Sequence, residues 1–253
     1  MPISPFPTMS IEHFPCSPLS HSFLNKVNCI RNARTAADVE HACFVFNKDM
    51  FALQENDERC EDAVPLIQEL LEFGTAQTLC DKFRLANDSP QLTELVTAIM
   101  MLLKGTHGNG TEHRSLPPDL RSCQAVETVL HTIQLFPDEH DLQAYSVHTL
   151  YLLLKTSRDD GYHDLERSAR SIGAVVLGVM ERFESSPFFF VQSTLILELI
   201  LANMNKNTSQ QFRKKALARI QVGLDVVPEA LDTARAVLNM LAPSTGKSIT
   251  AFI

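Results

Sequence analysis

The residues that could do chemistry in this chain are its nine histidines and six cysteines. His107 and His113 lie in the glycine-rich sequence HGNGTEH, and His140 and His148 stand two turns apart in one expected helix. A zinc site needs three or four convergent ligands, and each of these pairs supplies only two. The cysteines form no C-x-x-C pair, which argues against a structural zinc and a disulfide framework. We therefore expect no metal and no cofactor, with histidines in solvated loops or a groove and free, mostly buried thiols.

The sequence motifs for phosphate binding and catalysis are incomplete or absent. The sequence STGKS at 244–248 matches the end of a phosphate-binding loop, but Leu241 stands where the pattern requires a glycine, and no strand pattern precedes it. The sequence contains no nucleophile elbow and no signature of paired catalytic carboxylates. We therefore expect that the protein is not an enzyme.

Length and composition set the class of protein. The chain has 253 residues, of which 45% are hydrophobic, so it can bury a sizeable core. Its formal net charge of −8 argues against direct nucleic-acid binding by the molecule as a whole. The first twenty residues lack the basic start and apolar core of a secretory signal, and polar residues interrupt the longer apolar runs. We expect an intracellular protein, cytoplasmic or nuclear, with no membrane span.

Helical periodicity organises most of the chain. Thr35 and Asp38 form a weak capping-box pattern, after which apolar residues recur at helical spacing. These residues are Val39, Cys43, Phe46, Met50 and Leu53. Helical patterns then continue to the end without a convincing strand. The sequence therefore predicts an all-α protein with a flexible Pro/Ser-rich arm at 1–34, a helical repeat domain at 35–242 and a C-terminal tail at 243–253.

An internal repeat is visible in the second half of the chain. Phe136 aligns with Phe183 at an offset of 47 residues. Farther along, the dipeptide at 142–143 aligns with the dipeptide at 191–192 at an offset of 49, which places two extra residues in the second turn. Similar helices end near 105 and 242, so the units recur about every 40 to 50 residues, the period of HEAT and armadillo arrays. The third unit divides into three expected helices, at 162–169, 171–183 and 188–204.

The repeated segments VETVLHTIQLFPDEHDLQAYSVHTLYLLL and AVVLGVMERFESSPFFFVQSTLILELIL resemble the second and third helices of the armadillo family, including the Leu-Gln or Val-Gln that opens the third helix. The resemblance covers roughly residues 62–242, and HEAT repeats are the alternative. It implies a right-handed α-solenoid of about four armadillo-like three-helix repeats, in which stacking of units makes the core. Four leucines of the final helices should then be buried between units, namely Leu150, Leu153, Leu199 and Leu201.

The import-receptor branch of that family binds peptides with a ladder of Trp and Asn. At the matching Trp positions this chain has His148, Leu197 and Ala236, and at the Asn positions Leu152, Leu201 and Met240. The ladder is therefore missing, which argues against peptide binding of the import-receptor type.

The resemblance implies that the third helices line the concave groove of the solenoid, where a protein partner would bind. The expected groove residues are Tyr145, His148, Tyr151, Thr194, Glu198, Arg235 and Asn239. We expect a non-catalytic protein-binding scaffold or adaptor, monomeric outside its complex, whose partner the sequence does not identify. The alternative is a regulatory or structural subunit packed permanently into a larger assembly.

Two charged segments and one aromatic triplet each have two interpretations. Residues 38–62 are acidic, whereas 205–219 contain five basic residues and no acidic one. The basic residues are Lys206, Arg213, Lys214, Lys215 and Arg219. Both segments could be solvated helix faces, or the basic one could be a docking patch for an acidic or phosphorylated partner. Similarly, the aromatic triplet at 188–190 could pack against the next unit or form an exposed interaction patch.

Overall fold

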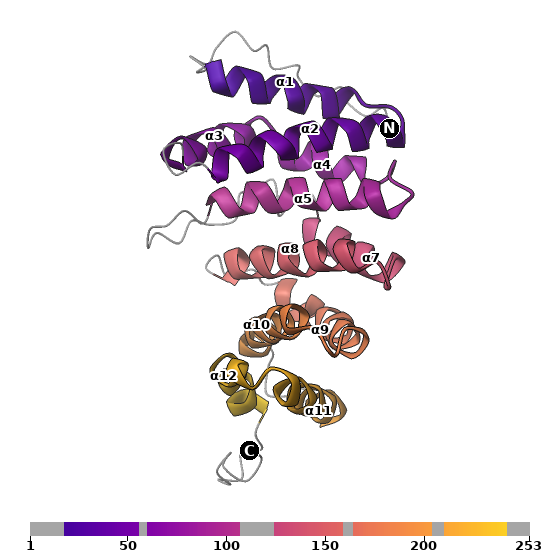
Figure 1. The fold of residues 1–253 in the computed structure, drawn as a ribbon, viewed down its shortest axis with the longest axis vertical. Coiled ribbons are helices and arrows are strands. Elements are labelled where there is room, and N and C mark those ends of the chain that lie inside the picture. The colour runs from indigo at the N-terminus through magenta and orange to yellow at the C-terminus, as the bar shows by residue number, and fades with distance from the viewer. Residues whose placement is uncertain (1–17, 56–59, 107–123, 159–163, 204–209, 242–253) are drawn as a thin grey trace.

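The computed structural model describes residues 18–55, 60–106, 124–158, 164–203 and 210–241. In these ranges the chain folds into helices and forms no strand, so the all-α prediction is confirmed there. The helices are α1 (Pro18–Asn32), α2 (Ala36–Gln54), α3 (Cys60–Glu72), α4 (Thr75–Lys82), α5 (Ser89–Thr106), α7 (Ala125–Leu135), α8 (His140–Arg158), α9 (Asp164–Arg182), α10 (Pro187–Asn203), α11 (Gln210–Val226), the short 3-10 helix η3 (Pro228–Ala230) and α12 (Leu231–Leu241) (Figure 1).

The helices form a two-layered stack along the long axis of the molecule (Figure 1). In one layer α2, α5, α8, α10 and α12 follow one another, and each packs against the next. In the other layer α7, α9 and α11 lie beside their partners, while α1, α3 and α4 pack together at the N-terminal end. The stack twists along its length, so that α2 and α5 run across the view and α10 and α12 point along it.

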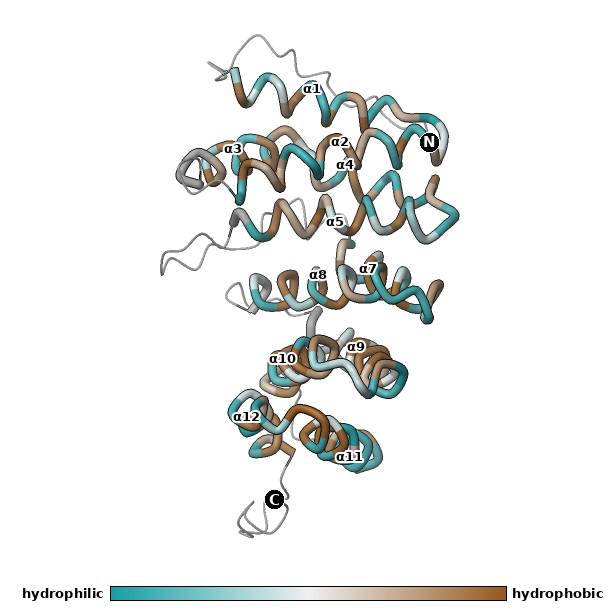
Figure 2. Tube along the Cα trace, in the orientation of Figure 1, coloured by the Kyte–Doolittle hydropathy of each residue, from teal (hydrophilic) through white to brown (hydrophobic). Residues whose placement is uncertain are grey.

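Each helix buries one apolar side against its neighbours. Hydrophobic and hydrophilic residues alternate along most helices, as one buried and one exposed face require (Figure 2). The four leucines expected in the core, at 150, 153, 199 and 201, are all buried. A single large cluster of buried side chains runs from α1 to α12.

The helix α2 begins as the sequence predicts. The backbone N–H of Asp38 donates to Oγ1 of Thr35 at 3.2 Å, and the backbone N–H of Thr35 donates to Oδ2 of Asp38 at 3.2 Å. These hydrogen bonds lower the pKa of the Asp38 carboxyl, because they favour its charged form. The capping box is thus complete, and the five apolar residues that follow it at helical spacing are buried.

The helix α1 corrects the prediction of an arm at 1–34. Residues Pro18–Asn32 are helical, and Phe23, Leu24, Val27 and Ile30 are buried against α2, α3 and α4. The Nζ of Lys82 in α4 donates to the carbonyls of residues 31 and 33, at 2.8 and 2.7 Å, and so satisfies acceptors at the end of α1. Residues 18–32 are therefore part of the packed helices and not of an arm. Residues 1–17 and the predicted tail at 243–253 lie outside the described residues.

The third unit contains two helices in the described residues, whereas the sequence analysis expected three. Its first two expected helices are one continuous helix, α9. The expected break fell at residue 170, inside this helix. Farther along the same helix Gly173 allows close packing, since a Cβ there would lie 2.6 Å from the ring of Phe212 in α11. The prediction of three-helix units is therefore wrong for this unit.

The repeat itself keeps one offset through both helices and the turn. Helices α8 and α10 bury matching positions exactly 47 residues apart, without any insertion. The buried pairs include Leu142 and Phe189, Gln143 and Phe190, Ser146 and Ser193, Val147 and Thr194, Leu150 and Leu197, and Leu153 and Ile200. The offset of 49 and the two extra turn residues are therefore wrong.

The aromatic triplet at 188–190 lies at the start of α10 and packs mainly inward. The ring of Phe189 stacks on that of Phe183 with centroids 4.2 Å apart, and so closes the turn between α9 and α10. The ring of Phe190 packs where a Cβ on Gly223 of α11 would collide with it. Only Phe188 remains exposed, at 42%. Two of the three phenylalanines therefore pack in the core, which favours the packing interpretation over an exposed patch.

Candidate functional site

A stripe of aromatic side chains runs along the exposed side of α8. Tyr145, His148 and Tyr151, all expected in the groove, are each half-buried, between the core and solvent. The rings of His148 and Tyr151 lie 6.4 Å apart and are tilted by 32°. The Nζ of Lys155 lies 5.8 Å from the centroid of the Tyr151 ring, within the range of a cation–π contact.

Matching positions on α5 and α10 extend this stripe into a broader face. The burial pattern of α5 matches that of α8 at an offset of 51 except at Thr97 and Met100, which are buried where His148 and Tyr151 are half-buried, and that of α10 matches it at 47. We define the α5–α8–α10 face by the half-buried and exposed residues at these matching positions: Glu94 and Lys104 on α5, Tyr145, His148, Tyr151 and Lys155 on α8, and Gln192, Leu195 and Glu198 on α10. Since α8 packs between α5 and α10, the face spans three neighbouring helices.

His148 links the middle of this face to α10. Its Nδ1 lies 3.2 Å from Oε1 of Gln192, and an amide oxygen only accepts, so the bond places the proton on Nδ1. The pKa of His148 is lowered, mainly because burial disfavours the charged imidazolium and also because Lys104 adds positive charge nearby. The hydrogen bond to Gln192 acts in the opposite direction. His148 is therefore neutral in the folded protein at pH 7.

This lowered pKa predicts that protonation of His148 destabilises the fold. Below the ordinary histidine pKa the unfolded chain binds the proton more readily than the folded one, so this contribution is present above that pKa and is lost as the pH falls. Urea unfolding at pH 7.5 and 5.5 should show a smaller drop in stability for His148→Gln than for the wild type. The exposed His131 on α7 gives the matched control, His131→Gln. An equal drop in the wild type and His148→Gln would contradict the assignment.

Of the four expected groove residues on α10 and α12, three are exposed or half-buried and one is buried. Glu198 is half-buried on α10, and Arg235 and Asn239 are exposed on α12, where Arg235 lies 3.1 Å from Asp232. Thr194 is completely buried, so its assignment to the groove is wrong. The cause is the two-residue error in the repeat.

At the correct offset of 47, the residues of α10 that match Tyr145 and His148 are Gln192 and Leu195, which the sequence analysis missed. The helices before them, α7 and α9, align at an offset of 47, and keeping this offset through the turn would have identified both residues. The same error shifts the α10 positions in the comparison with the import receptors, and Leu197 and Leu201, like Leu152 on α8, are buried.

Hydrogen bonds from α2 connect that helix to the N-terminal end of this face on α5. The Nδ2 of Asn47 donates to Oε2 of Glu94 at 2.7 Å and to the Glu94 carbonyl at 2.9 Å. Burial raises the pKa of the Glu94 carboxyl, the Asn47 hydrogen bond lowers it, and the negative charge of Glu40 raises it further. These contacts between α2 and α5 were not predicted. The acidic segment is thus not wholly a solvated face, because its Asn47 binds Glu94 of α5 and the charge of its Glu40 acts on the same carboxyl.

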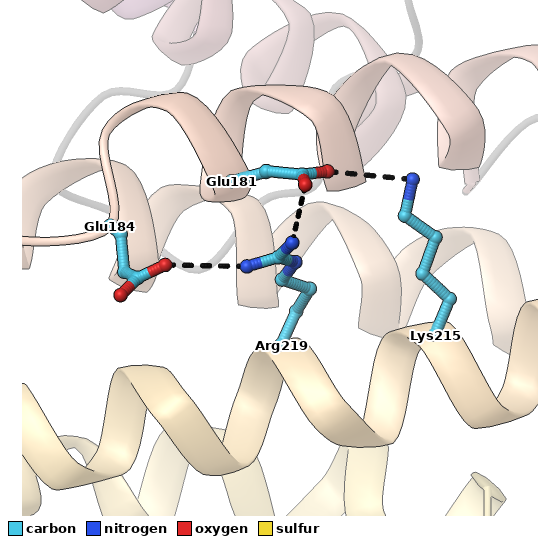
Figure 3. Close-up of polar contacts among 4 residues, drawn as sticks. All are labelled: Glu181, Glu184, Lys215 and Arg219. Atoms are coloured by element: carbon cyan, nitrogen blue, oxygen red, sulfur yellow. Dashed lines mark hydrogen bonds and ion pairs between the residues drawn. The ribbon is translucent and has the colours of Figure 1, made fainter.

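The basic segment of α11 contacts α9 of the same chain (Figure 3). Arg219 lies 2.6 Å from Glu181 and 3.3 Å from Glu184, and Lys215 lies 3.6 Å from Glu181. Arg213 donates to the carbonyl of residue 240 at 3.4 Å, Lys214 is exposed, and Lys206 lies outside the described residues. Two of the five cations are therefore engaged with carboxylates, which weakens the docking-patch interpretation.

The described residues offer no metal site. They contain no group of three or more His, Cys, Asp or Glu side chains that could hold an ion. His140 contacts Asp141 at 3.3 Å and the edges of two phenylalanine rings, whereas His148 faces Gln192, so the two do not converge. The other candidates, His107, His113 and the STGKS sequence, lie outside the described residues. Within the same ranges, no helix combines the length and the apolar character needed to cross a membrane.

The cysteines of the described residues differ in exposure and form no disulfide with one another. Cys43 and Cys80 are buried and Cys29 is exposed, and none of the three is in a disulfide. Burial raises the pKa of the Cys43 thiol to about 12, so it is not ionised at pH 7. Comparison of the chain with protein-family models, curated proteins and solved structures finds no match.

Proposed function

We propose that the chain is a non-catalytic protein-binding scaffold or adaptor, built as an α-solenoid of the armadillo and HEAT type. One observation carries the proposal: successive helices of one layer contribute partly exposed side chains at matching positions, which make up the α5–α8–α10 face. Stacked repeats characteristically bind partners along such extended surfaces. The two-helix third unit favours the HEAT variant, because armadillo units have three helices.

The side chains of the face suit protein recognition. Tyr145 and Tyr151 bury apolar ring area and keep a hydroxyl available for hydrogen bonding, which is why tyrosine is enriched among residues that dominate binding energy. His148 and Gln192 already hold each other by a hydrogen bond, so part of the surface is ordered before a partner arrives. We therefore assign the centre of the partner site to α8 and its edges to α5 and α10.

The distribution of exposed apolar residues supports an adaptor rather than a permanently buried subunit. The large exposed apolar side chains of the described residues are Phe44, Leu85, Leu135, Phe188, Val226 and Met240. One lies in each of α2, the connection between α4 and α5, α7, α10, α11 and α12. An obligate interface is larger and more continuously apolar. This distribution agrees with a surface that binds and releases a partner.

The test compares a variant of the face with a matched variant of the opposite layer. In the first, Tyr145, His148 and Tyr151 are changed to alanine. In the second, three exposed residues of α7, Glu127, His131 and Gln134, are changed to alanine. Each protein is immobilised and exposed to cell extract, and captured proteins are identified by mass spectrometry.

We expect the wild type and the α7 variant to retain the same partner and the α8 variant to lose it. Circular dichroism and thermal unfolding must show that both variants are folded, because Tyr145 and Tyr151 also pack against the core. If the α8 variant melts early, Glu198→Lys gives a second test at a residue that is only half-buried, and it should change the amount of partner captured. Undiminished capture by a folded α8 variant would remove the site from this face.

A further inference from the structure

We infer that the partner segment bound by the α5–α8–α10 face is an extended acidic peptide, whose carboxylates lie against Lys104 and Lys155. This inference rests on the proposed function and specifies the chemistry of the partner. Lys104 and Lys155 occupy matching positions of adjacent helices, 51 residues apart, and both side chains are exposed. They form a pair of positive charges on one edge of the face, at the C-terminal ends of α5 and α8.

The two lysines differ from the cations that stabilise the fold. Among the described residues, Lys26, Arg182, Lys215, Arg219 and Arg235 each form an ion pair with a carboxylate. Within the same ranges neither Lys104 nor Lys155 does so. A carboxylate brought by a partner could therefore pair with each of them without breaking an existing ion pair of the described structure.

Tyr151 positions the charge of Lys155, and the charge of Lys104 acts on His148. The Nζ of Lys155 is placed by the ring of Tyr151, 5.8 Å from its centroid. The positive charge of Lys104 is close enough to His148 to disfavour protonation of that imidazole. Tyr151 therefore lies beside the Lys155 ammonium group, and the residues that flank the two acidic positions of a bound peptide could contact the aromatic rings of α8.

The spacing of the lysines sets the spacing of the acidic residues. Packed helices lie roughly 8 to 10 Å apart, and an extended chain rises about 3.3 Å per residue. Side chains two residues apart in an extended peptide also point in the same direction. Flexible lysine side chains can take up the remaining difference, so two acidic residues separated by one other residue match the pair.

Charge elsewhere on the face favours a peptide over a nucleic acid. Glu94 lies on α5 and Glu198 on α10, and the chain as a whole carries a formal charge of −8. A polyphosphate backbone would meet these negative charges along its length, whereas a short peptide can place acidic residues only where the lysines are. Glu198 should weaken the binding of an acidic peptide by repulsion.

The experiment uses a library of random peptides displayed on phage and selected against the whole chain. Selected sequences are synthesised with a fluorescent label, and their binding is measured by anisotropy alongside versions in which Asp and Glu become Asn and Gln. The test variant combines Lys104→Gln and Lys155→Gln. The control variant combines Arg170→Gln and Lys214→Gln, which remove the same charge from exposed positions of α9 and α11.

We expect the selected peptides to be enriched in acidic residues one residue apart. Binding should weaken roughly tenfold in the test variant and in the amide peptides, because two exposed ion pairs are lost, and it should weaken with added salt. It should be unchanged in the control variant and stronger in Glu198→Gln. The variant that combines Lys104→Arg and Lys155→Arg keeps both positive charges and should therefore keep the binding.

Three other outcomes would overturn the inference, and they are distinguishable. Peptides that require Tyr145, His148 and Tyr151 but show no acidic preference would leave the proposed function intact and refute the acidic partner. Binding of a labelled single-stranded oligonucleotide that depends on the two lysines, without peptide binding, would assign the face to nucleic acid. Selection of no peptide that depends on the face would count against both proposals.

Discussion

A chain that begins at Thr35 is expected to lose most of the stability of the N-terminal half. The deletion removes α1, whose side chains at 23, 24, 27 and 30 are at most 5% exposed. Burying one such side chain contributes about 1.5 to 3 kcal/mol, and whole domains are stable by only about 5 to 15 kcal/mol. Loss of α1 also uncovers Phe46 of α2, whose ring meets that of Phe23 with centroids 5.9 Å apart.

The measurement is urea unfolding followed by circular dichroism, with three proteins compared: the full chain, a deletion of residues 1–17 and a deletion of residues 1–34. If α1 is the cause, the large loss should appear only with the longer deletion. A point variant gives an independent test, because Val27→Asp places a charge in the core, whereas the exposed Asn25→Asp should have little effect. An unchanged midpoint in the deletion of 1–34 would restore the interpretation of this segment as an arm.

The sequence predicted α2 well and α1 not at all, for a physical reason. The start of α2 is fixed by a local hydrogen-bonded capping box between Thr35 and Asp38, which short-range sequence can reveal. The helix α1 has only 15 residues, and helices of this length are marginal without tertiary packing. Its stability comes from contacts with α2, α3 and α4, and these contacts are not visible in a local pattern.

The error in the repeat has a chemical origin. The sequence alignment paired Gln143 with Gln192 because they are the same residue type. In the structure Gln143 is buried and donates through Nε2 to the carbonyls of residues 133 and 136, at 2.8 and 2.9 Å, which ties α8 to α7. The matching position on α10 is Phe190, which instead packs against Gly223. The matching positions 143 and 190 thus hold different residue types, so an alignment based on residue identity paired Gln143 with the wrong residue of α10.

The candidate site was predictable where one helix determines it. The spacing of Tyr145, His148 and Tyr151 alone places them on one side of α8, and the structure agrees. Contacts between helices were not predictable, because they join residues far apart in the chain. Asn47 and Glu94 are 47 positions apart, and Arg219 and Glu184 are 35 apart. Such pairs follow from how the stack is assembled, which local sequence does not specify.

The second large effect is expected for Leu197→Ala on α10, with Leu195→Ala as its matched control. Leu197 is completely buried, and replacing such a leucine with alanine costs about 2 to 5 kcal/mol through lost contacts and a cavity. Leu195 is only half-buried, so the same truncation should cost clearly less. Both changes are Leu→Ala in the same helix, so differences in helix propensity cancel.

This pair of variants also decides between the two offsets of the repeat. At 47, Leu197 matches the buried Leu150 and Leu195 matches the half-buried His148. At 49, Leu197 would match His148 and Leu195 would match Ser146, so the order of the two effects would reverse. Equilibrium unfolding in urea measures the free energies directly, and Leu150→Ala should cost about as much as Leu197→Ala. A larger loss for Leu195→Ala would restore the two-residue insertion and move the partner-facing side of α10 with it.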